Sequence, residues 1–239
     1  MKKLFFALVS FSFLSAGAQT VDEVIQKYAA NLGGLEAFNK IKTAKFTGTI
    51  TAQGNDLPII IQVINGKASR TDITVEVMNA KIINVYNNGT GWTQNPLAGS
   101  PTPKEVTGAP LNELKVQSML APVLMDYKAR GHQVELAGQA EVEGIKTHKI
   151  KLTNKDDGKV TTYFINASDY SLIKSESELD VQGQTVNVES FYSDLKEFSG
   201  VKFYMNRMQK MNGEAFRSTK LESIELNVTI DEKIFDMPK

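Results

Sequence analysis

The sequence has no cysteine, two histidines and one tryptophan in 239 residues. Without cysteine the chain forms no disulfide, holds no metal through thiolates and has no thiol nucleophile. It also lacks the cysteine that carries the lipid at the amino terminus of a bacterial lipoprotein. These absences exclude three common kinds of site and one kind of membrane anchor.

A net charge is missing as well, because Lys and Arg number 27 and Asp and Glu also number 27. Nucleic-acid-binding domains carry a basic patch or a strongly positive balance. A neutral chain likewise produces no strong field that could steer an ionic partner. We therefore expect no nucleic-acid partner.

The usual catalytic and metal-binding motifs are also absent. His132 and His148 belong to no HExxH pattern, and no acidic signature lies beside them. The sequence has no G-x-S-x-G nucleophile elbow and no glycine-rich phosphate loop. We interpret both histidines as strand-face or surface residues. We predict no catalytic residue, no metal, no cofactor and no enzymatic activity.

The amino terminus carries the one long apolar run. Residues 1–18 contain Lys2 and Lys3, an apolar core and a small-residue site ending at Ala18, which is typical of a cleaved secretory signal peptide. The sequence thus predicts export into a bacterial periplasm or, alternatively, secretion from the cell. Residues 19–239 contain no linker rich in proline, serine or glycine, so we predict a single domain there.

An amphipathic helix is predicted directly after residue 18. Thr20 and Glu23 have the spacing of a capping box. Apolar residues then recur at helical spacing up to Leu32, and Gly33-Gly34 ends the helix. A shorter helical turn through Phe38 is expected next.

From residue 42 the sequence predicts antiparallel strands. Runs of β-branched residues alternate with turn pairs that favour positive φ, and their spacing gives about ten strands in a meander. A wide sheet with one apolar face and no partner sheet is best closed by curling. We therefore predict an α+β fold, an open antiparallel half-barrel wrapped around helices. The turn pairs are Gly54-Asn55, Asn65-Gly66, Asn88-Gly89, Asp157-Gly158, Gln182-Gly183 and Asn212-Gly213.

Residues 110–127 are the one strongly apolar helical stretch in this strand-rich part, and we call them the plug segment. Their apolar surface extends beyond a single helix face, so we expect them to fill the interior of the half-barrel. Pro122 removes a backbone donor and should divide the helix into two arms. The helical stripe consists of Val116, Met119, Leu120, Val123, Leu124 and Tyr127.

The loop at residues 94–103 contains three prolines and leads into the plug segment. Irregular chain at the rim of a cavity opens more easily than a sheet, so this loop is a candidate for a mobile lid. A plain surface connection is the alternative.

Large and adaptable apolar side chains remain as candidates for a binding site. Such side chains line promiscuous pockets, and they equally fill ordinary cores. The candidate ligand-contacting residues are Leu114, Val116, Met119, Leu120, Val123, Leu124 and Tyr127 in the plug segment, with Trp92, Phe203 and Met205 from the strands.

A series of short motifs follows the capped helix along the chain. The motifs are Gly91-Trp92 before Pro96, Asp126-Tyr127-Lys128 before Gly131, Val142-Glu143-Gly144, Thr162-Tyr163-Phe164-Ile165, Gly200-Val201-Lys202-Phe203 and Ile234-Phe235-Asp236-Met237-Pro238. In this order the chain resembles the outer-membrane lipoprotein-sorting proteins common in Bacteroidetes, which belong to the LolA/LolB-like group. The likeness spans nearly all of residues 19–239, and it implies a half-barrel with a hydrophobic cavity for acyl chains.

The resemblance also implies a function. It suggests a periplasmic carrier or chaperone that transports lipids, or the acyl chains of lipidated proteins, towards the outer membrane and that meets envelope membrane proteins on the way. We expect it to act as a monomer. The alternative is a non-enzymatic scaffold or envelope-sensing module of the same fold without lipid cargo. In the better-known carriers an arginine holds the lid, and the arginines here are Arg70, Arg130, Arg207 and Arg217.

Overall fold

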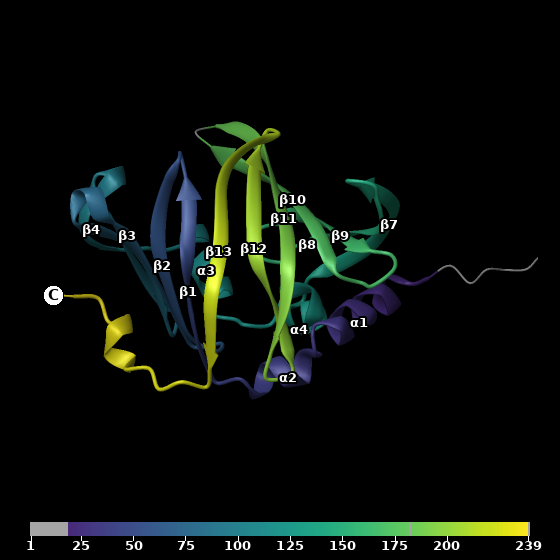
Figure 1. The fold of residues 1–239 in the computed structure, drawn as a ribbon, viewed down its shortest axis with the longest axis horizontal. Coiled ribbons are helices and arrows are strands. Elements are labelled where there is room, and N and C mark those ends of the chain that lie inside the picture. The colour runs from purple at the N-terminus through teal and green to yellow at the C-terminus, as the bar shows by residue number, and fades with distance from the viewer. Residues whose placement is uncertain (1–18, 182, 239) are drawn as a thin grey trace, which may run out of the picture.

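The computed structural model of the chain describes residues 19–181 and 183–238 (Figure 1). The expected signal peptide, residues 1–18, lies outside the described residues. Within the described part, no helix combines the length and the apolar character that a membrane crossing requires.

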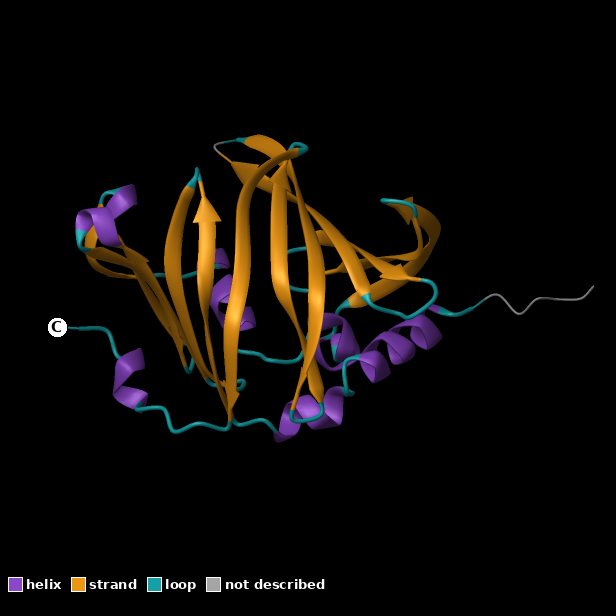
Figure 2. Ribbon diagram, in the orientation of Figure 1, coloured by secondary structure: helices purple, strands orange, loops and turns teal. Residues whose placement is uncertain are grey.

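One antiparallel sheet of thirteen strands dominates the described chain (Figure 2). Strands β1–β6 follow one another across one half of the sheet, and β7–β13 across the other. The halves join where β1 pairs with β13, so the first and last strands lie together at the centre. The strands are β1 (Thr43–Ala52), β2 (Asn55–Ile64), β3 (Ala68–Val75), β4 (Ala80–Asn87), β5 (Thr90–Asn95), β6 (Ser100–Glu105), β7 (Gln133–Val142), β8 (Ile145–Thr153), β9 (Val160–Asn166), β10 (Leu172–Val181), β11 (Gln184–Phe198), β12 (Val201–Met211) and β13 (Glu214–Leu226).

The predicted turns account for this topology. Asn88-Gly89 and Asn212-Gly213 connect their strands as two-residue hairpins in which all four residues have positive φ. The strand number exceeds the predicted ten partly because the loop expected at residues 94–103 is itself a hairpin. The prediction of an irregular lid there is wrong.

Two features explain why residues 94–103 form a hairpin, one at its tip and one at the edge of the sheet. The 3₁₀ turn η2 (Pro96–Ala98) is capped by Asn95, whose Oδ1 accepts hydrogen bonds from the amides of Leu97 and Ala98. Strand β6 carries Pro101 and Pro103 at the edge of the sheet. An edge strand tolerates proline because it needs no hydrogen-bond donor on its open side.

The amino-terminal helix forms as predicted. Helix α1 (Val21–Asn31) begins with the capping box, in which Thr20 Oγ1 accepts from the Glu23 amide and Glu23 Oε2 accepts from the Thr20 amide. Helix α2 (Leu35–Lys40) follows the two glycines. Figure 1 shows both helices along the lower end of the strands, and their buried residues join one apolar core.

The plug segment is less helical than predicted. It comprises α3 (Ala109–Gln117), the 3₁₀ turn η3 (Val123–Met125) and the start of α4 (Tyr127–Arg130). The helix ends at Ser118, before Pro122. Ser118 Oγ donates to the carbonyl of Lys115, and the residues that follow form hydrogen bonds with the β2–β3 turn. In that turn Gly66 donates to the carbonyl of Ser118, and Asn65 Oδ1 accepts from the Leu120 amide.

Side chains along each strand alternate between two faces of the sheet. We call the inner face the one that carries Phe46, Met205 and Ile224, because Leu120 of the plug segment packs against it. The opposite side is the outer face. The strands curve around α3 and α4, so the inner face is the concave one (Figure 1).

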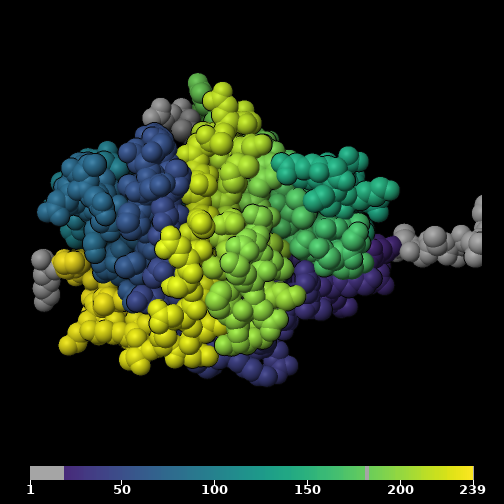
Figure 3. Space-filling model, in the orientation of Figure 1, coloured from purple at the N-terminus to yellow at the C-terminus, as the bar shows by residue number. Residues whose placement is uncertain are grey.

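The carboxy-terminal segment covers part of the outer face. The 3₁₀ turn η4 (Glu232–Phe235) packs on β3–β5, and Figure 3 shows this yellow segment against the blue strands. Trp92 Nε1 donates to the carbonyl of Phe235 at 3.1 Å, and Arg70 Nη1 donates to that of Ile234 at 2.6 Å. The outer face of β3–β5 is therefore covered by this segment.

Replacing Gly33 with alanine should destabilise the protein more than replacing Gly34, although both have positive φ. A Cβ at residue 33 would lie 2.2 Å from the carbonyl oxygen of Gly200 in the β11–β12 turn, whereas one at residue 34 meets nothing within 4 Å. Each variant loses about 1 kcal/mol through φ, and Gly33→Ala about 1–3 kcal/mol more through overlap. Urea denaturation measures both losses, and equal losses would contradict this close packing.

Candidate ligand-binding cavity

The plug segment lies between two apolar clusters of the core. One cluster gathers α1, α2, the end of the plug segment and β8–β10, and the other gathers inner-face residues of β1, β2, β12 and β13. Leu120 packs against both clusters. This part of the plug segment therefore joins the two halves of the interior.

A cavity of about 240 Å³ opens beneath Leu120–Leu124, where the two clusters meet. Its walls come from distant parts of the sequence and are mainly apolar or aromatic. The lining residues are Tyr28 and Leu32 from α1, Phe38 from α2, Leu120, Pro122, Val123 and Leu124 from the plug segment, and Tyr163, Leu172, Tyr192, Lys202, Phe203 and Tyr204 from β9–β12.

Three tyrosines of this wall, Tyr28, Tyr163 and Tyr204, remain uncharged at neutral pH. Burial raises the pKa of Tyr28 well above its usual value, and burial also raises the pKa of Tyr163 and that of Tyr204. The Tyr204 hydroxyl accepts a hydrogen bond from the Leu172 amide at 2.6 Å. The wall therefore offers aromatic surface without a buried negative charge, which suits an apolar ligand.

One lysine also belongs to the lining. The ammonium group of Lys202 donates to Asn31 Oδ1 at 3.2 Å, and the Lys202 amide donates to the carbonyl of Leu32. Both contacts tie the start of β12 to the end of α1. Lys202 thus has a structural role beside the cavity.

A polar clasp holds the plug segment against α1. Asp22 accepts a hydrogen bond from the hydroxyl of Tyr127 and another from the ammonium group of Lys128, the latter at 2.7 Å. These hydrogen bonds lower the pKa of Asp22, with Lys128 as the larger cause, while burial and Asp22 raise the pKa of Tyr127. The clasp connects an exposed ion pair to a core tyrosine.

Arg130 closes the other side of the plug segment. Its Nη2 donates to the carbonyl of Ala121 at 3.3 Å, and its Nε lies 2.6 Å from Asp126 Oδ1. Among the four arginines, Arg130 is thus the one that hydrogen-bonds the plug segment in the described residues. Arg70 instead holds the carboxy-terminal segment on the outer face.

The structure places the candidate ligand-contacting residues in three groups. Leu120, Val123, Leu124 and Phe203 line the cavity. Tyr127 and Met205 are buried in the two adjoining clusters, Leu114 is the buried residue of α3, and Met119 is half-buried. Trp92 and Val116 form the third group.

Trp92 and Val116 do not face the cavity. Trp92 is buried on the outer face beneath η4, because the register pairs it with Val85 on that side. Val116 is 51% exposed, because α3 stops one residue later and the helical stripe does not continue. Neither residue can contact a ligand bound under Leu120.

The lining residues that the sequence did not single out are mostly aromatic. Tyr28 and Leu32 lay in the predicted stripe of the first helix, but nothing in the sequence indicated that this stripe bounds a cavity. Tyr163, Tyr192 and Tyr204 come from strands whose mutual register only the structure reveals.

The histidines lie apart from this cavity. The ring of His148 stacks on Tyr170 with centroids 5.9 Å apart, and His132 Nδ1 accepts from the Lys155 amide. Burial lowers the pKa of both histidines. Among the described residues, no three histidine or acidic side chains gather as a metal-ligand set.

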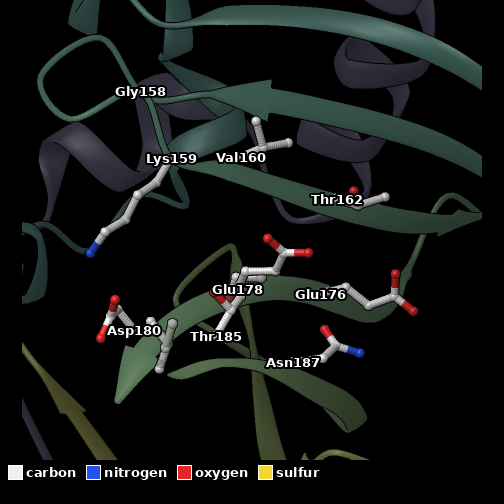
Figure 4. A pocket seen from close by; sticks show the side chains of 11 residues that line it. Gly158, Lys159, Val160, Thr162, Glu176, Glu178, Asp180, Thr185 and Asn187 are labelled. Carbon is white, nitrogen blue, oxygen red and sulfur yellow. The ribbon is translucent and has the colours of Figure 1, made fainter. Parts of the chain in front are cut away.

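Two larger cavities have different walls. One of about 480 Å³ lies on the outer face of β9–β11, and Figure 4 shows Glu176, Glu178 and Asp180 around it. Another, of about 440 Å³, has polar residues such as Ser193 and Asn206 from β11–β13 in its wall. Carboxylates and other polar groups make both poorer sites for an acyl chain, because burying them without partners is unfavourable.

Solved structures with the same architecture cover nearly the whole chain. A LolA superfamily protein from Nitrosomonas europaea is 14% identical, with a TM-score of 0.60 over 92% of this chain and 98% of its own. A DUF1329 family protein from Desulfovibrio piger is 11% identical, with a TM-score of 0.61 over the same shares.

A third similar structure is a domain named for outer membrane lipoprotein sorting, from Vibrio parahaemolyticus. It is 10% identical, with a TM-score of 0.58 over 90% of this chain and 95% of its own. No protein-family model and no curated protein matches the sequence. The chain therefore has the LolA-like fold, and the predicted half-barrel is confirmed.

The clasp should make stability depend on pH through Asp22. A carboxyl group with a lowered pKa stabilises the folded state above its unfolded-state pKa, and this contribution disappears as the pH falls through the folded-state pKa. Asp22→Asn should therefore be less stable than the wild type at neutral pH, and the gap should close below the usual pKa of 3.8.

Thermal unfolding across this pH range measures the gap. Glu36→Gln is the matched control, because Glu36 pairs with Lys40 on α2 while both side chains are largely exposed. Glu36→Gln should lose less stability at neutral pH than Asp22→Asn. A gap for Asp22→Asn that does not change with pH would contradict the clasp.

Proposed function

We propose that this protein is an exported, non-enzymatic carrier that binds acyl chains of lipoproteins or other lipids and moves them towards the outer membrane. The observation that carries the proposal is the apolar cavity between α1, the plug segment and the inner face. The LolA-like fold and the names of two similar structures, which refer to LolA and to lipoprotein sorting, support the same reading.

Such a carrier has to shield the acyl chain from water, because exposed apolar surface is unfavourable. An acyl chain of about 16 carbons exposes apolar surface worth roughly 12 kcal/mol, at about 0.8 kcal/mol per methylene. Crossing an aqueous compartment requires a protein that covers this surface. A cavity bounded by aromatic and aliphatic side chains can supply the cover.

The size of the cavity indicates how a chain would enter. Pockets for small molecules usually measure about 300–1,000 Å³, and this cavity has about 240 Å³. If a methylene fills roughly the volume of a water molecule, about 30 Å³, the cavity holds about eight carbons. A whole chain therefore requires the plug segment to move.

The middle of the plug segment is suited to such movement. Residues 118–126 contain one 3₁₀ turn and no strand, and few backbone hydrogen bonds hold them. Segments with little regular structure open at lower free energy than paired strands. Displacing Leu120 and Leu124 would join the cavity to the inner face of β12 and β13.

Protein exported by its own signal sequence and purified without detergent should carry lipid. Organic extraction followed by mass spectrometry should detect acyl chains in about stoichiometric amount, because a loaded carrier hides them from water. An unrelated exported protein prepared in parallel is the control. Protein that carries no lipid and also fails to bind a fluorescent fatty acid would favour the alternative, a scaffold module without lipid cargo.

Filling the cavity should weaken binding without unfolding the protein. Val123→Trp adds a ring in place of about three methylenes of ligand, so affinity for a fluorescent fatty acid should fall roughly fiftyfold, at about 0.8 kcal/mol per methylene. Val116→Trp makes the same exchange at an exposed site of the plug segment and should bind normally. Unchanged affinity of Val123→Trp, with both variants stably folded by thermal unfolding, would place the ligand elsewhere.

A further inference from the structure

Two arginines share the inner face with the apolar residues beside the cavity. On β12, Phe203, Met205 and Arg207 follow at every second position, so their side chains lie on one face. Arg217 of β13 is paired with Gln209 and joins the same face. This face is thus apolar near the plug segment and cationic farther along.

The partners of both guanidinium groups are neutral. Arg207 donates from Nε and Nη2 to Ser190 Oγ at 3.4 and 3.1 Å, and Arg217 Nε donates to Gln209 Oε1 at 2.8 Å. Gln209 Nε2 also donates to Ser190 Oγ, at 3.3 Å. Hydrogen-bond donors therefore exceed acceptors here, because each guanidinium group carries five N–H bonds.

Neither guanidinium group forms an ion pair within the described residues, although Glu143 lies in the wall of the same cavity of about 440 Å³ as Arg207. The arginine ion pairs found there are Arg70–Asp72 and Arg130–Asp126, and neither Arg207 nor Arg217 forms one. The positions that the register pairs onto their face are Ser175, Ser190, Tyr192, Gln209 and Thr219. The acidic residues of β10 point to the outer face instead, where they surround the cavity in Figure 4.

The two charges also act on each other. Burial, and then the positive charge of Arg207, lower the pKa of Arg217. Both side chains are nevertheless accessible to a ligand, because each residue is exposed to solvent. An anion placed between them would relieve the repulsion and supply acceptors for the remaining N–H groups.

The spacing fits an amphiphile that spans both regions. At about 3.3 Å per residue, Arg207 lies roughly 7 Å beyond Met205 and 13 Å beyond Phe203 along the strand. A chain that leaves the cavity past Phe203 and Met205 would therefore bring its polar end to the arginines.

We propose that Arg207 and Arg217 bind the anionic head group, a carboxylate or a phosphate, of an acyl-chain ligand held in the cavity. This inference rests on the proposed carrier function and narrows its cargo to anionic amphiphiles. The planar guanidinium fork matches the oxygens of both groups in a bidentate arrangement. Neutral acylated molecules would gain nothing from this end of the inner face.

The test compares three ligands with one tail: dodecanoate, dodecyl phosphate and dodecanol. Isothermal titration of the mature protein should give about tenfold tighter binding of one or both anions than of the alcohol, the effect of one charge-assisted contact. Raising the salt concentration should reduce this preference. Stronger binding of dodecyl phosphate would indicate a phospholipid, and stronger binding of dodecanoate a fatty acid.

Substitutions of the two arginines test whether they cause the preference for anionic ligands. Arg207→Gln and Arg217→Gln should each reduce it several-fold while dodecanol binds as before, and Arg217→Lys should retain part of it. Lys220→Gln removes the same charge from β13 on the outer face, where Lys220 pairs with Asn206, and should change nothing. Circular dichroism and thermal unfolding check that each variant is folded.

The outcomes separate the two proposals. Equal affinity for all three ligands, or a preference that survives both glutamine variants, would overturn the head-group site and leave the carrier function in place. Failure of all three ligands to bind would overturn both.

Discussion

The contact between the plug segment and the inner face is the interaction on which the rest of the structure depends. A single curved sheet has an apolar face that only helices and the plug segment can cover. Leu120 joins the two core clusters. Asn65 binds the amide of Leu120 itself, while Arg130 and Asp22 hold the chain that follows. The cavity exists because these polar anchors fix the segment where its side chains do not fill the space completely.

Because strand residues alternate between two faces, some basic and acidic side chains lie on opposite sides of the sheet. The overall composition does not show this separation of charge. The chain has equal numbers of basic and acidic residues, so its overall charge gives no reason to expect an anion site. Along β10–β13, however, Arg207 and Arg217 lie on the inner face while Glu176, Glu178 and Glu189 lie on the outer face. Local potential depends on which face a residue occupies, and a neutral chain can therefore place two arginines together on one face of its sheet.

Sequence reasoning worked where the signal is local. The capping box, the glycine stop and the Asn-Gly hairpins each depend on neighbouring residues, and each forms as predicted. It did not predict where a side chain lies when residues far apart in the sequence determine that location. The location of Trp92 away from the cavity was not predictable, because an alternating pattern does not reveal which face is covered, and the carboxy-terminal segment covers the outer one. Val116 was misplaced because Asn65 and Ser118 end the helix early.

The dimensions of the cavity bear on how cargo would be released. Covering about eight carbons gains roughly 6 kcal/mol, which corresponds to dissociation constants of tens of micromolar before ordering of the ligand is counted. A head-group contact worth about tenfold brings binding towards the micromolar range. Affinity shared between a half-covered tail and an exposed ion pair is enough to load a ligand at a membrane. It is also weak enough for an acceptor that covers the remaining carbons to take the ligand away.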